Sequence, residues 1–202
     1  IDSLRESKVM SLKTRFGNLG NILDFDNLTE EDIYVLDSPI LTNSQFKKFK
    51  KYFSKKIKII DCTFEIDLSL KDRIKIIKED CETAVREGST VLILSDKNIS
   101  NERASIPTIL AVGAVHSHLV KLGLRGYCSL NVESSDALDT HSFAVLIGVG
   151  ATTVNPYLAI DSIYQRFEKQ LFEKLDFESC VKKFKKSIDA GLLKIMSKMG
   201  IS

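Results

Sequence analysis

From Ile57 onward, short apolar segments alternate with amphipathic helical patterns, and this alternation restricts the fold more than any other feature of the sequence. The apolar segments have the length and β-branched composition of buried strands, which we expect at residues 57–63, 90–95, 128–133 and 152–154. Apolar residues at helical spacing follow each of them, and we expect helices at residues 69–87, 106–122, 139–147, 155–172 and 177–196. Strand–helix units in series favour parallel strands with right-handed crossovers. The sequence therefore predicts an α/β fold.

Two architectures satisfy this pattern of repeated β/α units. One is an open α/β sheet, and the other is half or more of a (β/α) barrel, incomplete or distorted. Periodicity alone does not choose between them. We expect a single domain, in which residues 57–175 form the β/α core and residues 176–202 form a C-terminal helix and its continuation.

Residues 1–56 follow a different pattern, and we expect them to pack on the core as an irregular and helical segment. Leu4 to Arg15 has helical character, whereas glycine and asparagine interrupt the pattern over residues 17–32. Val35 to Leu41 is predicted to be an edge strand, because Pro39 lacks the donor that a central strand needs. Ser44 is expected to cap a helix whose phenylalanines recur at spacings of three and four, at Phe46, Phe49 and Phe53.

Several residues mark the ends of the predicted helices. Ser69 is expected to be an N-cap, with Asp72 three positions later as the acid of a capping box. Gly88 and Gly123 are placed to end helices, because glycine adopts the left-handed conformation found after the last turn. Asn155 and Pro156 predict a cap and a first helical residue, and Pro107 suits another first turn.

Composition excludes several classes of partner. The net charge of +2 gives no strong field toward nucleic acid, and no run of about 18 apolar residues could span a membrane. Residues 1–12 lack the layout of a signal peptide, and the absence of an initial Met suggests a fragment, a processed product or an expression product. Two lysine runs are interpreted as solvated helix faces: Lys47, Lys48, Lys50, Lys51, Lys55, Lys56 and Lys58, and Lys182, Lys183, Lys185 and Lys186.

No metal site is expected. His116 and His118 are two positions apart in a predicted helix, so they point to opposite faces and do not share a ligand. His141 lies near two aspartates, and we interpret all three histidines as packing or capping residues. The cysteines have no zinc or iron–sulfur spacing and are expected to be reduced structural thiols: Cys62, Cys81, Cys128 and Cys180.

Acidic residues fall at or near the carboxyl ends of predicted strands, the edge that usually carries the site in α/β folds. They are Asp61, Asp96 after Ser95, and Glu133. Two readings stay open: a polar ligand pocket, or acids that cap the following helices or pair with loop amides. Gly148-Val149-Gly150-Ala151 is similar to part of a phosphate-binding loop, but it follows a helix, so a helix end and turn is favoured. The sequence offers no nucleophile and base pair, and we expect no catalytic residue.

Six segments in order resemble the central domain of the glutamate synthase large (alpha) subunit, over essentially the whole chain. They are residues 1–12, 37–41, 94–99, 111–114, 143–151 and 191–202. The last, Gly191-Leu192-Leu193-Lys194-Ile195-Met196-Ser197-Lys198-Met199-Gly200-Ile201-Ser202, is similar to the beginning of the flavin domain. Members of the family often carry Arg and a His pair where this chain has Leu138, His141 and Ser142, which leaves the role of that loop open.

The resemblance implies a barrel-like α/β domain of an oxidoreductase that makes two glutamates from glutamine, 2-oxoglutarate and reductant. A glutaminase domain and an FMN barrel with an iron–sulfur cluster would be partners in the same polypeptide. This segment would hold no cofactor, would not be catalytic alone, and would line part of the ammonia tunnel. The electron donor, a small NAD(P)H-oxidising subunit or ferredoxin, stays open. The location implied is cytoplasmic, or plastid in a photosynthetic eukaryote.

The resemblance also supplies site candidates. Met10, Ser11 and Thr14 are uncharged residues in the least regular part of the chain, and they are expected to line the ammonia tunnel. Four residues at the end are expected to approach the flavin in the intact enzyme: Lys198, Met199, Gly200 and Ser202. The alternatives are a free-standing metabolite-binding α/β domain that uses the strand-end acids, and a nucleic-acid-binding module that uses the lysine runs.

Overall fold

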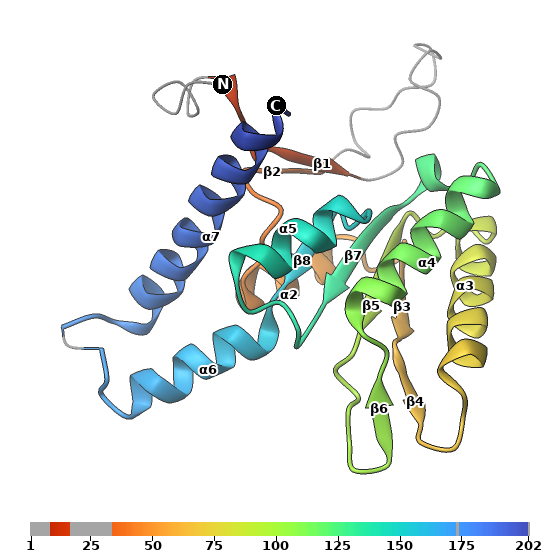
Figure 1. Ribbon diagram of the computed structural model, residues 1–202, viewed down its shortest axis with the longest axis horizontal. Helices are drawn as coiled ribbons and strands as arrows, with labels where there is room; N and C mark the ends of the chain where they lie inside the picture. Colours follow the sequence, from red (N-terminus) through yellow and green to blue (C-terminus); the bar gives the residue numbers. More distant parts are fainter. Residues whose placement is uncertain (1–8, 17–33, 173, 202) are drawn as a thin grey trace.

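A four-stranded parallel sheet forms the centre of the computed structural model, which describes residues 9–16, 34–172 and 174–201. Its strands, in spatial order, are β3 (Ile57–Asp61), β5 (Val91–Ser95), β7 (Ser129–Glu133) and β8 (Thr153–Asn155). All neighbours pair in parallel, with Ile57 opposite Val91 and Val91 opposite Ser129. The predicted α/β fold with parallel strands is confirmed (Figure 1).

Three crossover helices cover one face of this sheet: α3 (Leu70–Arg86), α4 (Thr108–Lys121) and α5 (Thr140–Gly148) (Figure 1). The main core lies between these layers. Leu92, Leu94, Leu130 and Val132 point toward the helices from the two central strands, and Ile77 meets them from α3. Because successive strand residues point to opposite faces, the intervening residues face the other side of the sheet.

The other face is filled by α2 (Asn43–Tyr52), which precedes the sheet in sequence. Phe46, Phe49 and Phe53 pack there against Val91 and Ile93. In a closed barrel this face would be lined by further strands. The four strands do not close among the described residues, and an aromatic helix occupies the concave side, so the domain is an incomplete, barrel-like α/β fold.

A short segment extends the sheet beside β8. Ile40 forms a parallel bridge with Val154, and Leu41 N donates to Val154 O at 2.9 Å. The long helix α7 (Phe177–Met199) holds this segment, because Ser38 Oγ donates to Asp189 Oδ1 at 2.6 Å and Lys185 Nζ donates to Ile40 O at 2.7 Å. The motif over residues 37–41 therefore has a structural role at the sheet edge.

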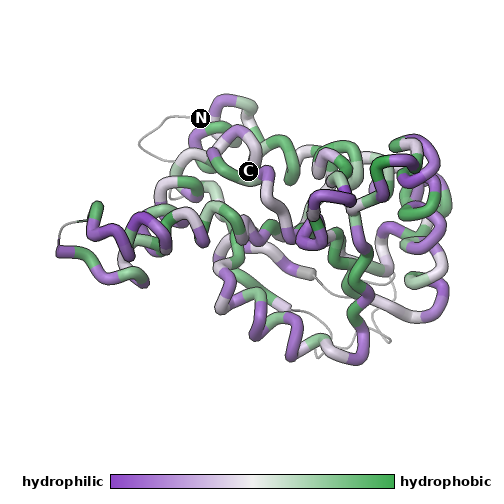
Figure 2. The backbone as a smooth tube through the Cα atoms, turned by 90° about the horizontal axis from the view of Figure 1, so that it is seen from below, coloured by the Kyte–Doolittle hydropathy of each residue, from purple (hydrophilic) through white to green (hydrophobic). Residues whose placement is uncertain are grey.

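The remaining strands form two small antiparallel sheets. β1 (Thr14–Phe16) pairs with β2 (Tyr34–Leu36), and β4 (Thr63–Glu65) pairs with β6 (Arg103–Ser105) as an arm beyond the carboxyl edge of the main sheet (Figure 1). The helix α6 (Tyr157–Glu168) and α7 extend to one side of the body in both views (Figures 1 and 2). No helix among the described residues is long and apolar enough to cross a membrane.

Most predicted helix ends are confirmed. Ser69 caps α3 and accepts from Asp72 N at 3.1 Å. The capping box expected at Asp72 is not formed, because its Oδ2 accepts from Ser69 Oγ at 2.6 Å and not from the Ser69 backbone. Gly88 and Gly123 follow their helices with φ of 94° and 68°. The Gly148–Gly150 stretch is a helix end and turn, since α5 stops at Gly148 and Gly150 has a φ of 120°.

Some predicted elements were wrong. Thr14–Phe16 is a strand, so the helix expected over residues 4–15 does not reach Arg15. Residues 4–8 of that predicted helix lie outside the described residues. The irregular segment expected over residues 17–32 also lies outside them. Thr42, not Ser44, caps α2, because its side chain accepts from Gln45 N while Gln45 Oε1 accepts from Thr42 N. The edge strand expected over residues 35–41 is divided: β2 covers its first part, and Ile40 forms the bridge at the edge of the main sheet.

Asn155 does not cap α6. It is the last residue of β8, and its amide donates to Leu41 O at 2.9 Å and to Asn43 Oδ1 at 3.0 Å, so Pro156 takes the position before the helix. Pro107 likewise precedes α4, and α6 ends at Glu168 rather than near residue 172. The strand expected over residues 57–63 is broken at Cys62, after which the chain leaves the sheet to form β4.

Candidate functional site

The carboxyl edge of the sheet gathers the acids that the sequence singled out. Glu133 ends β7 with only 4% of its surface exposed. Ser95 Oγ donates to Glu133 Oε2 at 2.8 Å, and the ammonium groups of Lys97 and Lys50 lie 3.2 and 3.4 Å from Oε1. Burial alone would raise the pKa of Glu133, but the Ser95 hydrogen bond and the two lysines outweigh it and lower the pKa. Glu133 is therefore a buried carboxylate that stays charged.

Asp96 lies beside Glu133, on the neighbouring strand end, and is 2% exposed. Its Oδ2 accepts from Ser135 N at 2.8 Å and from Ser135 Oγ at 2.7 Å. Burial and the nearby Asp96 carboxylate together raise the pKa of the Tyr157 phenol well above its usual value. The Tyr157 hydroxyl therefore stays protonated against this acid, and its ring lies under the Lys97 ammonium at 5.2 Å.

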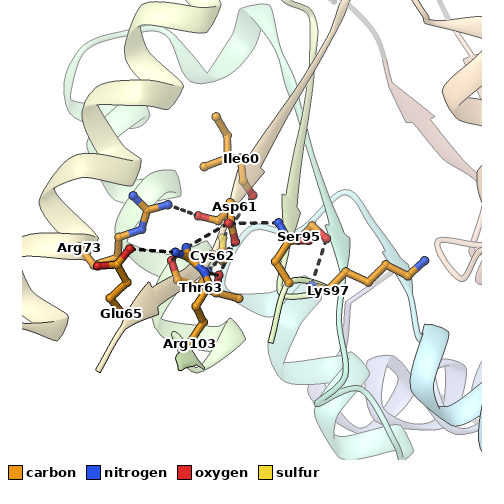
Figure 3. Close-up of polar contacts among 10 residues, drawn as sticks. Ile60, Asp61, Cys62, Thr63, Glu65, Arg73, Ser95, Lys97 and Arg103 are labelled. Atoms are coloured by element: carbon orange, nitrogen blue, oxygen red, sulfur yellow. Dashed lines mark hydrogen bonds and ion pairs between the residues drawn. The ribbon is translucent and has the colours of Figure 1, made fainter. Parts of the chain in front are cut away.

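Asp61 anchors the β4–β6 arm (Figure 3). Arg103 Nη2 donates to Asp61 Oδ2 and to Thr63 O, both at 3.2 Å, and Arg103 Nε donates to Thr63 Oγ1 at 2.9 Å. Arg73 from α3 donates to Asp61 O at 2.5 Å. Burial would raise the pKa of Asp61, but hydrogen bonds from Thr63 and Asn98 and the Arg103 charge lower it. A shallow cavity of about 340 Å³ next to this cluster is lined partly by Arg73 and Arg103.

These contacts favour the reading in which the strand-end acids pair within the chain. Asp61, Asp96 and Glu133 are engaged by side chains and amides of the chain itself. Lys50 belongs to a run interpreted as a solvated face, and that interpretation was wrong for this residue, as it was for Lys185 on α7. The edge is an internal network that ties α2, β5 and β7 together.

Sequence reasoning missed a buried polar layer on the concave face. Thr153 Oγ1 donates to Asn131 Oδ1 at 2.6 Å, and Asn131 Nδ2 donates to Leu92 O at 3.2 Å and to Ser129 Oγ at 3.0 Å. Asn131 and Thr153 are both fully buried. The alternation of Ser129, Asn131 and Glu133 with Leu130 and Val132 was the available signal, since period two separates the faces of a strand.

The amino edge of the sheet is held by Arg125. Its guanidinium donates to Cys128 O at 2.6 Å, to Gly150 O at 2.9 Å and to His116 Nδ1 at 3.2 Å. Burial and the Arg125 charge lower the pKa of His116. His118 contacts Glu82 at 2.9 Å on the other side of α4, so the two histidines lie apart as predicted. No group of three or more His, Cys, Asp or Glu side chains in the described ranges is placed to hold a metal ion.

The tunnel candidates lie just before β1 and at its first residue. Met10 is buried, Ser11 is exposed, and Thr14 begins β1 with partial exposure. Ser11 Oγ accepts from Lys13 N at 3.1 Å, and Thr14 Oγ1 donates to Leu12 O at 3.0 Å. Leu12 packs against the main core, which fixes this segment to the body.

The flavin-side candidates lie at the end of α7. Lys198 and Met199 form the last turn and are exposed, and Gly200 ends the helix in the left-handed conformation with a φ of 71°. Ser202 lies outside the described residues. In Figure 1 this end of α7 and the β1–β2 sheet lie at the same end of the molecule.

Comparison with known proteins adds the identity of the domain. Residues 1–202 match the glutamate synthase central domain family along their whole length. The chain belongs to this family. It is 52% identical to the glutamate synthase (NADPH) large chain of Azospirillum brasilense, over 100% of this chain and 14% of that protein.

Other relatives carry the same central domain within different glutamate synthases. The ferredoxin-dependent glutamate synthase of Pyropia yezoensis is 38% identical over 100% of this chain and 14% of its own length. The glutamate synthase (NADH) of Schizosaccharomyces pombe is 38% identical over 100% of this chain and 10% of its own length. The chain thus spans about one tenth to one seventh of the relatives it matches. Among solved structures, a putative fructose-1,6-biphosphate aldolase from Coccidioides immitis has a TM-score of 0.33 at 13% identity, over 70% of this chain and 56% of that chain, which is too slight a likeness for any argument.

Proposed function

We propose that this chain is the connecting domain of a glutamate synthase, which joins a glutaminase domain to an FMN domain and forms part of the wall of the ammonia tunnel. The observation that carries the proposal is the family match over residues 1–202, together with 52% identity to a large chain of that enzyme. The parent enzyme converts glutamine, 2-oxoglutarate and reductant into two glutamates.

The role of such a domain follows from the chemistry of ammonia. In neutral water ammonia is mostly protonated, and the ammonium ion is not a nucleophile. A passage that excludes water keeps the molecule neutral and prevents its loss between the two reaction centres. Its walls need small polar groups and backbone carbonyls, because a fixed negative charge would favour the protonated form and hold it in place.

Met10, Ser11 and Thr14 are our candidates for this wall. They carry no charge, and the Thr14 hydroxyl is oriented by Leu12 O. The flavin-side candidates Lys198, Met199, Gly200 and Ser202 follow in a segment that is similar to the beginning of the flavin domain. The location of β1 and of the end of α7 at the same end of the molecule supports a passage directed toward the flavin (Figure 1).

The cofactors and redox partner belong to the rest of the parent enzyme. We place both FMN and the iron–sulfur cluster outside this segment. For the cluster, the support is that the four cysteines are buried thiols and that burial raises the pKa of Cys62 to about 12, which does not suit thiolate ligands. Relatives named for NADPH, NADH and ferredoxin all align with the whole chain. The electron donor is therefore selected elsewhere, through a small NAD(P)H-oxidising subunit or by direct contact with ferredoxin.

The test is Thr14→Trp in the full-length enzyme, with Lys13→Trp as the control. A bulky ring at a tunnel wall obstructs ammonia, so we expect glutamine hydrolysis to continue while the glutamate formed per glutamine hydrolysed falls several-fold. Lys13 is an exposed neighbour in the same segment, and its replacement should leave the ratio unchanged. An unaltered ratio in Thr14→Trp would remove Thr14 from the tunnel.

A further inference from the structure

The outward face of α4 lacks the charges that a solvated helix carries. Residues 108–120 contain no Asp, Glu, Lys or Arg. The inner face is fully buried through Ala111, Val112, Val115 and Leu119. The outer face nevertheless exposes 41% of Ile109, 46% of Leu110 and 53% of Val120. A helix that is apolar on both its inner and its outer face is normally covered on both.

The neighbouring helix α3 shows what a solvated face looks like in the same layer. Lys75 and Glu79 form an ion pair on its surface, with 72% and 60% of their side chains exposed. Since α4 packs between α3 and α5, its sides and inner face are occupied within the domain (Figure 1). Its outer face, made of Ile109, Leu110, Gly113, Ser117 and Val120, is the part that lacks a covering element among the described residues. We name these five residues the α4 face.

We propose that the α4 face is a docking surface for an uncharged, apolar segment of the same polypeptide, outside residues 1–202. This inference rests on the proposed function, in which the segment is one part of a longer enzyme. In the Azospirillum brasilense relative, the segment that matches this chain accounts for 14% of the polypeptide. Most of such a polypeptide is therefore available to cover the α4 face. A tethered domain acts at an effective concentration of about millimolar or more, which a second copy does not reach in dilute solution.

The chemistry of the face also restricts its occupant. An apolar surface buries a charged side chain at high cost, because the charge loses its hydration without gaining a partner. The hydroxyl of Ser117 and the two flanking histidines are the only side-chain polar groups of residues 109–120. The occupant is therefore apolar at its centre, with any polar groups at the margin of the contact.

A substitution with opposite effects on a free and a covered helix tests the proposal. Ser117→Glu, in the full-length polypeptide, places a carboxylate four residues before Lys121. On a free surface this change stabilises the helix, because Glu has a higher helix propensity than Ser and pairs with a lysine at this spacing. Under a docked segment it buries a charge, so we expect the melting temperature to fall by several degrees. A melting temperature that is unchanged or raised overturns the proposal.

Ser162→Glu on α6 is the matched control. Ser162 is exposed, and Arg166 follows it at the same spacing of four residues. This variant has the same change in charge and propensity beside an existing charged surface, so its melting temperature should be unchanged or slightly raised. A separate assay distinguishes this proposal from the proposed function. Glutamine-dependent glutamate formation by the unmodified full-length polypeptide tests the proposed function alone, whereas the melting temperatures of the variants test the α4 face.

Photo-crosslinking identifies the occupant. With p-benzoylphenylalanine in place of Leu110 in the full-length polypeptide, we expect a light-dependent crosslink to a peptide outside residues 1–202. The crosslinked product should migrate as a single polypeptide and not as a dimer. The same residue at Lys75 should give no such link, because that position is solvated. A link between two copies, or links confined to residues 1–202, overturns the proposal.

Discussion

Glu133 keeps its charge although its side chain is almost entirely buried. The sequence placed this acid at a strand end, but its partners come from distant parts of the chain, with Lys50 83 residues before it and Ser95 38 residues before it. A buried charge of this kind is stabilising only while its partners remain, because removing one side leaves the others desolvated. The network therefore locks α2 onto the strand ends and does not present a free carboxylate.

The lowered pKa of Glu133 makes a prediction about pH. A carboxylate with a folded pKa below its ordinary value of 4.5 contributes stability above that value, and the contribution is lost as the pH falls through the lower folded value. Glu133→Gln should thus reduce the free energy of unfolding by about 1–3 kcal/mol at neutral pH. Urea unfolding should show that the difference from the unaltered chain shrinks below pH 4.5.

The control for this variant is Glu79→Gln, which removes one partner of an exposed ion pair on α3. Such pairs contribute about 0–1 kcal/mol, so this change should be close to neutral at every pH. A destabilisation by Glu133→Gln that stays constant with pH would show that packing, and not charge, dominates at the strand end.

At the scale of elements, caps and periodicity predicted the helices, and contacts across the fold set their exact ends. Ser69 was found from its local pattern because an N-cap bonds within one turn. Asn155 carried an equally good local signal, yet its amide is engaged by Leu41 and Asn43, more than a hundred residues earlier. The arm strands β4 and β6 were missed because three residues each are too few to show a period.

The contact between α5 and α7 depends on a glycine in the middle of a helix. A Cβ atom at Gly191 would lie 2.5 Å from Thr140 Cγ2 and 2.7 Å from Thr140 Oγ1. Gly191→Ala should therefore destabilise the fold, although alanine is the better helix former by about 1 kcal/mol. Denaturant unfolding should show this loss and its partial rescue in the Gly191→Ala, Thr140→Ala double variant.

Gly113→Ala in α4 is the comparison for that experiment. A Cβ at Gly113 meets no atom within 4 Å, so in the 202-residue chain the substitution should stabilise by up to about 1 kcal/mol. If Gly191→Ala were stabilising as well, the two helices would have room that the structure does not show, and the close packing of α7 on α5 would be contradicted.

On the scale of the whole molecule, the open α/β sheet and the long terminal helix are compatible with the connecting role that we propose. α2 fills the concave side of the sheet, and the Ile40 segment extends it beyond β8. The last turn of α7 is exposed at the end of the molecule that also carries the β1–β2 sheet.

We therefore predict that the 202-residue chain purifies without flavin. A cofactor site buries most of its ligand, and the flavin-side candidates Lys198, Met199 and Gly200 form only a single exposed turn. Absorption spectra recorded across the gel-filtration peak should lack a flavin band. A flavin band that co-elutes with the chain would mean that this segment builds a complete binding site.

The sequence by itself determined the α/β class, the parallel sheet and most helix limits, because strand and helix periods and caps act over a few residues. It also determined the family, through motifs in a fixed order. Only the tertiary structure decided that the barrel stays open around α2, that Lys50 and Lys97 neutralise Glu133, and that α4 keeps an apolar outer face. These features depend on groups far apart in the chain, whose approach is set by packing and burial and leaves no local pattern.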